Sequence, residues 1–233
     1  APVFTAISGT DNPFELVGVE RDAAPAFVDL DADGDLDLVS GTESGQLLTW
    51  RNTGTTTSPT FTALTGTDNP FAAIDVGRSS APAFVDLDGD GDLDLVSGEL
   101  YGRFLAWRNT GTSAAPVFTD LVGAENTVYS HRVRLFSKPA FVDLDDDGDL
   151  DLVSGEAFAA PSAWRNIGSL TAPAFTALEG TENPFSGLRA SFASFGGAPA
   201  FMDLDGDGDP DFVSGIDRGT FLVWRNTTPR LSI

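Results

Sequence analysis

The pattern DxDxDGxxD occurs four times in this chain of 233 residues, and this repetition constrains the fold more than any other feature. The copies begin at Asp29, Asp86, Asp143 and Asp203. In each copy, the tryptophan of a Trp-Arg-Asn sequence follows the first aspartate by 21 residues. Fixed internal spacing indicates one supersecondary unit repeated along the chain. Because repeated units share a continuous core, we expect residues 1–233 to form a single domain of four repeats of about 57 residues.

Each repeat carries four short apolar runs separated by turns that contain glycine. In the second repeat these runs are residues 82–85, 93–97, 104–108 and 116–119. Such runs are typical of β-strands, and no helical periodicity accompanies them. A sheet of four short strands is too small to be stable alone, and runs this continuously apolar predict sheets that are covered on both faces. Blades of a propeller have this arrangement, so we predict an all-β fold, a four-bladed β-propeller.

The two ends of the chain predict how the ring closes. Residues 1–5 match the fourth apolar run of a repeat, as at residues 115–119, whereas Trp224 belongs to a third run near the end of the chain. We therefore expect residues 1–7 to complete the last blade, which would remove two exposed sheet edges. The alternative is that this complementarity acts between two chains in an eight-bladed homodimer. The chain is accordingly expected to be a monomer or a homodimer.

The repeated pattern has the spacing of a calcium-binding loop. In EF-hand-like loops, positions 1, 3, 5 and 9 offer oxygen ligands, position 6 is glycine, and position 7 offers its backbone carbonyl. Hard oxygen ligands without histidine or cysteine favour calcium over zinc or copper. We predict about four Ca2+ ions, one in each blade. The candidate metal-site residues are Asp29, Asp31, Asp33, Asp35, Asp37, Asp86, Asp88, Asp90, Asp92, Asp94, Asp143, Asp145, Asp147, Asp149, Asp151, Asp203, Asp205, Asp207, Asp209 and Asp211.

Residues 84–98, with the Trp-Arg-Asn-Thr-Gly sequence that follows them, resemble the FG-GAP/VCBS repeat family. Repeats of that family form the blades of integrin α-subunit propellers and of many secreted or cell-surface proteins. The resemblance covers nearly the whole chain and implies a calcium ion in the loop between the first two strands of each blade. This chain differs from the integrin pattern in having Gly98-Glu99 where Gly-Ala-Pro is usual, and four repeats where seven are common.

The formal net charge of −22 constrains partners and location. More than half of the acidic residues lie in the four loops, and the rest of the chain is almost neutral. Such a charge disfavours nucleic acid and anionic membrane surfaces as partners. No apolar stretch is long enough for a transmembrane segment. Because loops rich in aspartate suit millimolar calcium, we expect a secreted, cell-surface or lumenal location.

The sequence offers little material for catalysis. It contains no cysteine, one histidine, His131, and two tyrosines, Tyr101 and Tyr129. We therefore predict no enzymatic activity, but an interaction or adhesion module, or an accessory subunit of an extracytoplasmic assembly, with a protein or glycan partner. An alternative is a multivalent carbohydrate-binding lectin, because some propellers of this family bind sugars between blades. A weaker alternative is a polysaccharide lyase that uses His131 and Tyr129, or the accessory domain of an enzyme.

Aromatic and basic residues that repeat are expected to have structural roles. We expect the tryptophans at 50, 107, 164 and 224 to pack between blades. The arginine after each tryptophan should cover apolar surface and pair with a nearby acid. Phe14, Phe71 and Phe185, in Asn-Pro-Phe turns, are candidates for a partly exposed partner surface. Residues 124–138 and 186–198 depart from the repeat, and we expect recognition to lie there.

Overall fold

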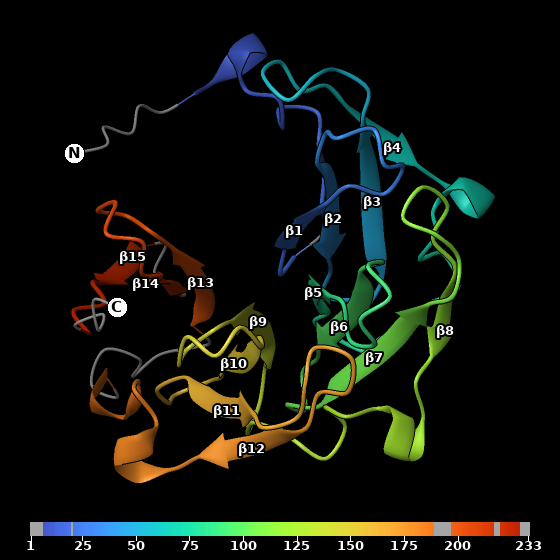
Figure 1. Ribbon diagram of the computed structural model, residues 1–233. Coiled ribbons are helices and arrows are strands. Elements are labelled where there is room, and N and C mark those ends of the chain that lie inside the picture. The colour runs from blue at the N-terminus through green and yellow to red at the C-terminus, as the bar shows by residue number, and fades with distance from the viewer. Residues whose placement is uncertain (1–6, 20, 189–196, 217–219, 229–233) are drawn as a thin grey trace.

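The computed structural model describes residues 7–19, 21–188, 197–216 and 220–228. Their strands form four antiparallel sheets arranged as the blades of a four-bladed β-propeller, which confirms the predicted all-β fold (Figure 1). The strands are β1 (Ala24–Val28), β2 (Asp37–Gly41), β3 (Leu47–Asn52), β4 (Phe61–Leu64), β5 (Ala81–Val85), β6 (Asp94–Gly98), β7 (Phe104–Asn109), β8 (Phe118–Asp120), β9 (Lys138–Val142), β10 (Asp151–Gly155), β11 (Ser162–Asn166), β12 (Phe175–Leu178), β13 (Ala198–Met202), β14 (Asp211–Ile216) and β15 (Thr220–Trp224).

Strands follow one another in sequence order within each sheet. The first strands pack side by side, β1 beside β5, β5 beside β9 and β9 beside β13. Figure 1 shows these strands near the middle, with β4, β8 and β12 toward the outside. Short 3-10 helices lie at the periphery, namely η1 (Gly9–Asp11), η2 (Gly66–Asp68), η3 (Gly123–Glu125) and η4 (Gly180–Glu182). No helix within the described ranges is long and apolar enough to cross a membrane.

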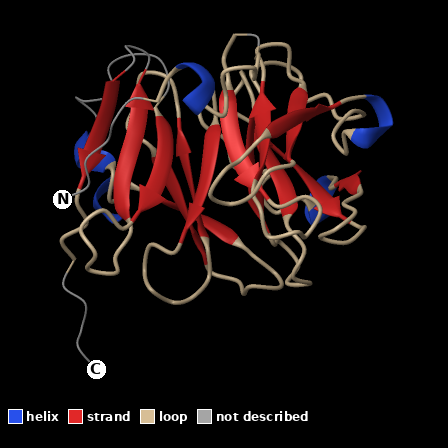
Figure 2. Cartoon of the chain, turned by 90° about the horizontal axis from the view of Figure 1, so that it is seen from above, coloured by secondary structure: helices blue, strands red, loops and turns tan. Residues whose placement is uncertain are grey.

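The core consists of three clusters, one at each contact between successive sheets. Leu47 of the first sheet packs with Leu95 and Trp107 of the second, and the other two contacts have equivalent clusters. Every residue of β2, β6 and β10 is buried, as the continuous apolar runs predict. The tryptophans of the first three repeats are also buried, which confirms their place in the core. Figure 2 shows the sheets side by side in a view turned by 90°.

Glycine at the end of the second strand allows neighbouring sheets to approach closely. A Cβ atom at Gly98 would overlap the backbone carbonyl oxygen of Ser137, which precedes β9. Gly41 and Gly155 face the next sheet in the same way. The Ser137 side chain strengthens this contact, because its Oγ accepts a hydrogen bond of 2.8 Å from the backbone N–H of Glu99. Only glycine fits where two backbones approach this closely.

The phenylalanine rings of the Asn-Pro-Phe turns pack against the sheet that follows them in the chain. The ring of Phe71 stacks on Phe118 of the second sheet, with 4.7 Å between ring centroids. Phe185 packs against Phe212 of the fourth sheet at 4.8 Å. Both Phe71 and Phe185 are buried, so the prediction that they form a partner surface is wrong. Phe14 remains partly exposed while it stacks on Phe61.

The linker after the second sheet follows the repeat more closely than its sequence indicates. Val128 is buried at the position equivalent to Phe71, and its N–H donates to Oδ1 of Asn126. The N–H of Val133 donates to the carbonyl of Gly102, at the position equivalent to a bond made by Val76 in the preceding linker. Residues 124–138 thus differ from the repeat in sequence but keep these two backbone interactions, and the expectation that recognition lies there stays a prediction.

Two predictions fall partly or wholly on residues that the structure does not describe. Pairing of residues 1–7 with the last blade involves residues 1–6, which lie outside the described ranges. Residue 7 is exposed and belongs to no strand. Within the second divergent segment, residues 189–196 are also outside the described part of the chain.

The close approach at Gly98 generates a test of the fold. Gly98→Ala should lower the free energy of unfolding by about 1–3 kcal/mol, because the added methyl group forces two sheets apart. Gly18→Ala is the matched control, since a Cβ there meets no atom within 4 Å. Urea denaturation of both variants measures the difference. Equal stability of the two variants would contradict the close-packed contact.

Candidate functional site

Four loops of one conformation join the first and second strands of the sheets. Position 6 of each loop is a glycine with φ between +90° and +92°, in the left-handed region that glycine adopts most readily. Its N–H donates to Oδ2 of the first aspartate, and this distance is 2.9 Å in all four loops. These glycines are Gly34, Gly91, Gly148 and Gly208. The repeated pattern thus folds into one tight frame at four places.

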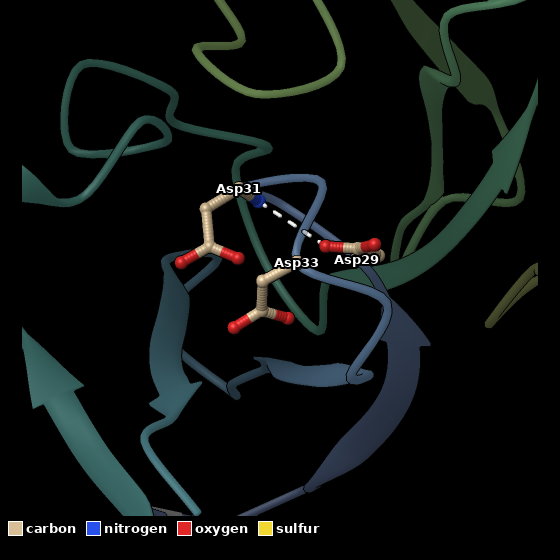
Figure 3. Close-up of side chains that lie close together, drawn as sticks. All are labelled: Asp29, Asp31 and Asp33. Atoms are coloured by element: carbon tan, nitrogen blue, oxygen red, sulfur yellow. Dashed lines mark hydrogen bonds between the residues drawn. The ribbon is translucent and has the colours of Figure 1, made fainter. Parts of the chain in front are cut away.

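Each frame brings three carboxylates together. One oxygen from each of three aspartates lies within 4.8 Å of the others, and Figure 3 shows the side chains of the first loop. Positions 1 and 3 contribute in every loop, position 5 in the first two and position 9 in the last two. The clusters are Asp29, Asp31 and Asp33; Asp86, Asp88 and Asp90; Asp143, Asp145 and Asp151; and Asp203, Asp205 and Asp211. The predicted position-7 residues, Asp35, Asp92, Asp149 and Asp209, add no side chain to these clusters.

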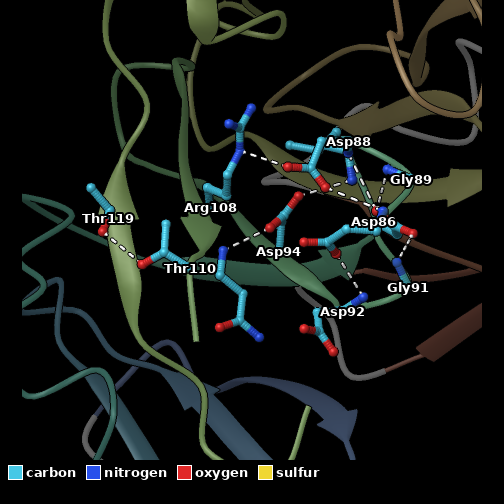
Figure 4. Close-up of polar contacts among 12 residues, drawn as sticks. Asp86, Asp88, Gly89, Gly91, Asp92, Asp94, Arg108, Thr110 and Thr119 are labelled. Atoms are coloured by element: carbon cyan, nitrogen blue, oxygen red, sulfur yellow. Dashed lines mark hydrogen bonds and ion pairs between the residues drawn. The ribbon is translucent and has the colours of Figure 1, made fainter. Parts of the chain in front are cut away.

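The aspartate at position 9 has a structural role that sequence reasoning missed. The carboxylate of Asp94, which is labelled in Figure 4, is buried. It accepts two backbone hydrogen bonds, from Leu87 at 2.9 Å and from Asn109 at 2.7 Å. It therefore ties the loop and the second strand to the end of the third strand. Asp37, Asp151 and Asp211 make the same pair of bonds. The fixed separation of 15 residues between each aspartate and the asparagine of Trp-Arg-Asn is the sequence signal for this clamp.

Burial raises the pKa of the aspartate at position 9 in three of the four loops. Desolvation raises the pKa of Asp94 to about 6, against the lowering effect of its two backbone hydrogen bonds. The pKa values of Asp37 and Asp151 are raised by the same cause. A cation bound beside these carboxylates would favour their charged form and oppose the effect of burial.

An arginine from the third strand pairs with the aspartate at position 3 in every loop. The Nε–Oδ2 distance is 2.9 Å between Arg108 and Asp88 (Figure 4). The other three pairs have distances of 2.8–3.0 Å. The prediction that each arginine pairs with a nearby acid is confirmed. Because the side chains are partly exposed, each pair alone contributes little to stability.

The donor set fits a hard divalent cation. In the first loop, Oδ1 of Asp31 is buried and has no hydrogen-bond partner among the described residues. Oδ1 of Asp143 is buried without a partner in the same way. A buried charged oxygen without a hydrogen-bond donor destabilises the folded state. A cation that coordinates the oxygen would remove this cost. Carboxylate oxygens in such loops suit calcium, whereas zinc prefers nitrogen and sulfur ligands.

A groove of about 580 Å³ lies beside the second sheet, away from the loops. Ile74 and Leu121 supply apolar lining, and Asp75, Asp120 and Tyr129 supply polar groups. These three polar residues do not repeat, because the equivalent positions in other repeats carry other residue types: Arg132 for Asp75, Ala63 and Ala177 for Asp120, and Ala72 and Ser186 for Tyr129. An equivalent groove of about 400 Å³ lies beside the first sheet, so the groove itself recurs and the side chains of Asp120 and Tyr129 distinguish the one beside the second sheet.

The residues of the predicted lyase alternative belong to different surroundings. Tyr129 lines the groove, whereas His131 is not among its lining residues. His131 occupies the place that Ile74 has in the preceding repeat, and its ring lies 5.8 Å from that of Trp164. Burial lowers the pKa of His131, which favours the neutral imidazole. This environment is that of a packing residue.

Comparison with known proteins identifies the repeat family of the chain. Residues 29–97, 86–154 and 143–214 each match the FG-GAP-like repeat family, so the chain belongs to this family. No curated protein matches the chain. A solved structure of a lectin from Agrocybe aegerita, which recognises non-reducing terminal N-acetylglucosamine, is 20% identical with a TM-score of 0.47. The match covers 87% of this chain and 48% of the lectin chain, so this chain spans about half of its length.

The clamp at position 9 can be tested without metal. In the presence of EGTA, Asp94→Asn should lower the free energy of unfolding by about 1–3 kcal/mol, because an amide offers one acceptor oxygen to two buried N–H groups. Asp68→Asn, at an exposed position in η2, is the control. Both variants are measured by urea denaturation. A metal-free Asp94→Asn protein as stable as the control would show that this carboxylate serves the cation alone.

Proposed function

We propose that this protein is a non-catalytic, calcium-stabilised propeller that serves as an interaction or adhesion module, or as an accessory subunit, outside the cytoplasm. The observation that carries the proposal is the identical hydrogen-bonded frame of the four loops. A feature that recurs at the same position in every blade serves a role common to all blades. Stabilisation of the fold is such a role. The features that recognise a partner belong to side chains that differ between blades.

Calcium in each loop would neutralise carboxylates that otherwise repel one another. At roughly ten times the dissociation constant, a bound ion stabilises the folded state by about 1.4 kcal/mol per site, or about 5–6 kcal/mol for four sites. This amount is comparable to the whole net stability of a typical domain. The requirement for millimolar calcium in such loops supports a secreted, cell-surface or lumenal location.

Chelation tests the role of calcium directly. EGTA should lower the melting temperature by many degrees, and re-addition of calcium should restore it, whereas magnesium should restore less. Calorimetric titration should count about one ion per loop, and Asp90→Ala should remove one ion from that count. Asp68→Ala, outside the loops, should leave the count unchanged. A melting temperature that does not respond to EGTA would refute the stabilising role of calcium.

The environment of His131 supports the absence of catalysis. General acid–base catalysis requires a group within reach of the substrate, and His131 packs among the aromatic side chains of the third sheet. The loop carboxylates are poor acids and bases once they hold a cation, because the bound charge lowers their pKa values. The proposed activity is therefore binding of a protein or glycan partner.

Carbohydrate binding is the second candidate function, and the groove beside the second sheet favours it. Asp75, Asp120 and the buried Asn126 offer hydrogen-bonding groups next to apolar surface, and Tyr129 is half exposed at the same groove. Sugar hydroxyls donate to carboxylates, while the apolar face of a sugar ring packs on an aromatic side chain. Because Asp120 and Tyr129 do not repeat, we propose one such site per chain in place of the predicted multivalent arrangement.

The two tyrosines provide an internal control for sugar binding. Tyr101 and Tyr129 are each 56% exposed, but only Tyr129 lines the groove. A glycan selected from an array should shift the 13C-labelled ring signals of Tyr129 and leave those of Tyr101 unchanged. Asp120→Ala, which restores the alanine of the other repeats, should abolish both the shift and the array signal. Absence of any glycan signal, or equal shifts of both tyrosines, would contradict this candidate function.

A further inference from the structure

The linker between the second and third sheets gathers cations that no carboxylate neutralises. Six arginines in the described part of the chain form ion pairs with aspartate or glutamate. Arg132, Arg134 and Lys138 lie together in the linker and form no ion pair with any described residue. Carboxylates are abundant in a chain with a formal net charge of −22, so three unpaired cations in one segment are unusual. This segment is therefore a candidate site for an external anion.

Arg132 lies directly opposite a second arginine. The backbones of Arg103 and Arg132 form an antiparallel bridge. Side chains of directly opposed residues lie on the same face, with Cβ atoms about 4.5–5.5 Å apart, and like charges in such a pair repel each other. The preceding repeat has Gln46 and Asp75 at the equivalent positions, so the backbone pairing itself does not require two arginines. An anion bound by both side chains would remove their repulsion.

Glu99 holds one side of the Arg103 guanidinium and leaves the rest of it accessible. Oε1 of the buried Glu99 accepts a hydrogen bond of 3.1 Å from Nε of Arg103. The Nη atoms of Arg103 form no hydrogen bond with a described residue, and its side chain is 43% exposed. The Arg132 side chain is exposed and has no described partner either. Both arginines therefore retain donors for an oxyanion, which guanidinium groups bind through paired hydrogen bonds.

The arginine pair adjoins the groove beside the second sheet. Arg103 comes two residues before Leu105, which lines the groove, and residues two apart in extended backbone lie on the same face. Arg132 follows Tyr129, another lining residue, in the same linker. The pKa of Arg103 is raised mainly by Glu99 and also by Tyr129, so this tyrosine lies near the guanidinium. The groove and the arginine pair are thus neighbouring parts of one surface.

We propose that the groove beside the second sheet binds an acidic sugar, and that Arg103 and Arg132 bind the carboxylate or sulfate group of this sugar. The inference rests on the carbohydrate binding proposed above and specifies the class of sugar. Asp75 and Asp120 line the groove and would repel an acid group there, so the acid group belongs at the arginines. The sugar hydroxyls would donate to the two aspartates, and the ring would pack on Tyr129. Opposite charges at the two ends of the site would orient the ligand.

The charge of the whole chain restricts the ligand further. A formal net charge of −22 repels a densely charged polyanion over a long range, which disfavours its association. An isolated uronic acid or sulfated unit in an otherwise neutral glycan brings a single acid group, which the arginine pair can neutralise. The equivalent groove beside the first sheet is lined by Gln46 and Asp75 and by no arginine. We therefore expect the preference for an acidic sugar at the second sheet alone.

An NMR titration of the calcium-loaded protein with 15N-labelled arginine tests the acid group. The probes are the methyl glycosides of glucuronic acid, galacturonic acid and galactose 6-sulfate, each compared with the uncharged methyl glucoside or galactoside. At least one acidic probe should shift the Nε signals of Arg103 and Arg132 and leave that of Arg51 unchanged. It should bind at least about tenfold more tightly than its neutral counterpart, because hydrogen bonds to charged groups are the stronger ones. Equal affinities, or arginine signals that do not shift, would overturn the inference.

Replacement of one arginine tests the pair without disturbing the fold. Arg132→Gln should reduce the affinity for the acidic probe about tenfold, to that for its neutral counterpart, and leave the neutral affinity unchanged. The melting temperature should not change, because Arg132 is exposed and the preceding repeat has Asp75 at this position. Arg21→Gln is the matched control, since Arg21 is also exposed and forms no ion pair with a described residue. Equal losses in the two variants would refute a specific role of Arg132.

Asp120→Ala separates this inference from the carbohydrate binding on which it rests. The variant should abolish binding of both acidic and neutral probes, whereas Arg132→Gln should affect the acidic probes alone. If acidic and neutral probes bind wild type equally and Asp120→Ala abolishes both, the groove binds sugars and the preference for an acid is refuted. If Asp120→Ala leaves acidic binding intact and inorganic sulfate shifts the same arginine signals, the pair binds anions in general. That result would overturn both the acidic sugar and the groove as a carbohydrate site.

Discussion

Contact between successive sheets is the interaction on which the rest of the structure depends. A sheet of four short strands has too little core of its own, and β2, β6 and β10 are buried only because other elements cover both faces. Gly98 and its equivalents let the next backbone approach, and Phe71 or its equivalent packs onto the next sheet. Stability is therefore shared between neighbours, as in other repeat proteins, and a blade without a neighbour has an incomplete core.

The acidic loops are connected to this shared core through one residue in each repeat. The aspartate at position 9 is buried between strands, while the aspartates at positions 1 and 3 face the place where carboxylates converge. A cation at that place would act on the same loop whose other end is held by Asp94 or its equivalent. Binding of a cation there would thus be coupled to strand packing through one loop.

The sequence predicted those parts of the fold and site that depend on local spacing. Aspartates at alternate positions around a glycine converge in any chain that turns there, so the clusters around Asp29 and Asp86 were predictable. Burial of Phe71 was not, because an Asn-Pro-Phe turn gives no sign of the sheet on which it packs. Asp75 and Asp120 come from different repeats and meet in one groove only after folding. Likewise, His131 looked unusual until the structure placed it in the position of Ile74.

The two backbone hydrogen bonds of Asp94 have a consequence for the motions of a blade. The amide protons of Leu87 and Asn109 are 22 residues apart in the chain, yet they share one carboxylate acceptor. Opening of the loop therefore exposes an amide of the loop and an amide of the third strand in the same event. Local unfolding in each blade thus proceeds as one cooperative unit that includes the loop, the second strand and the end of the third, instead of beginning as fraying of a surface turn.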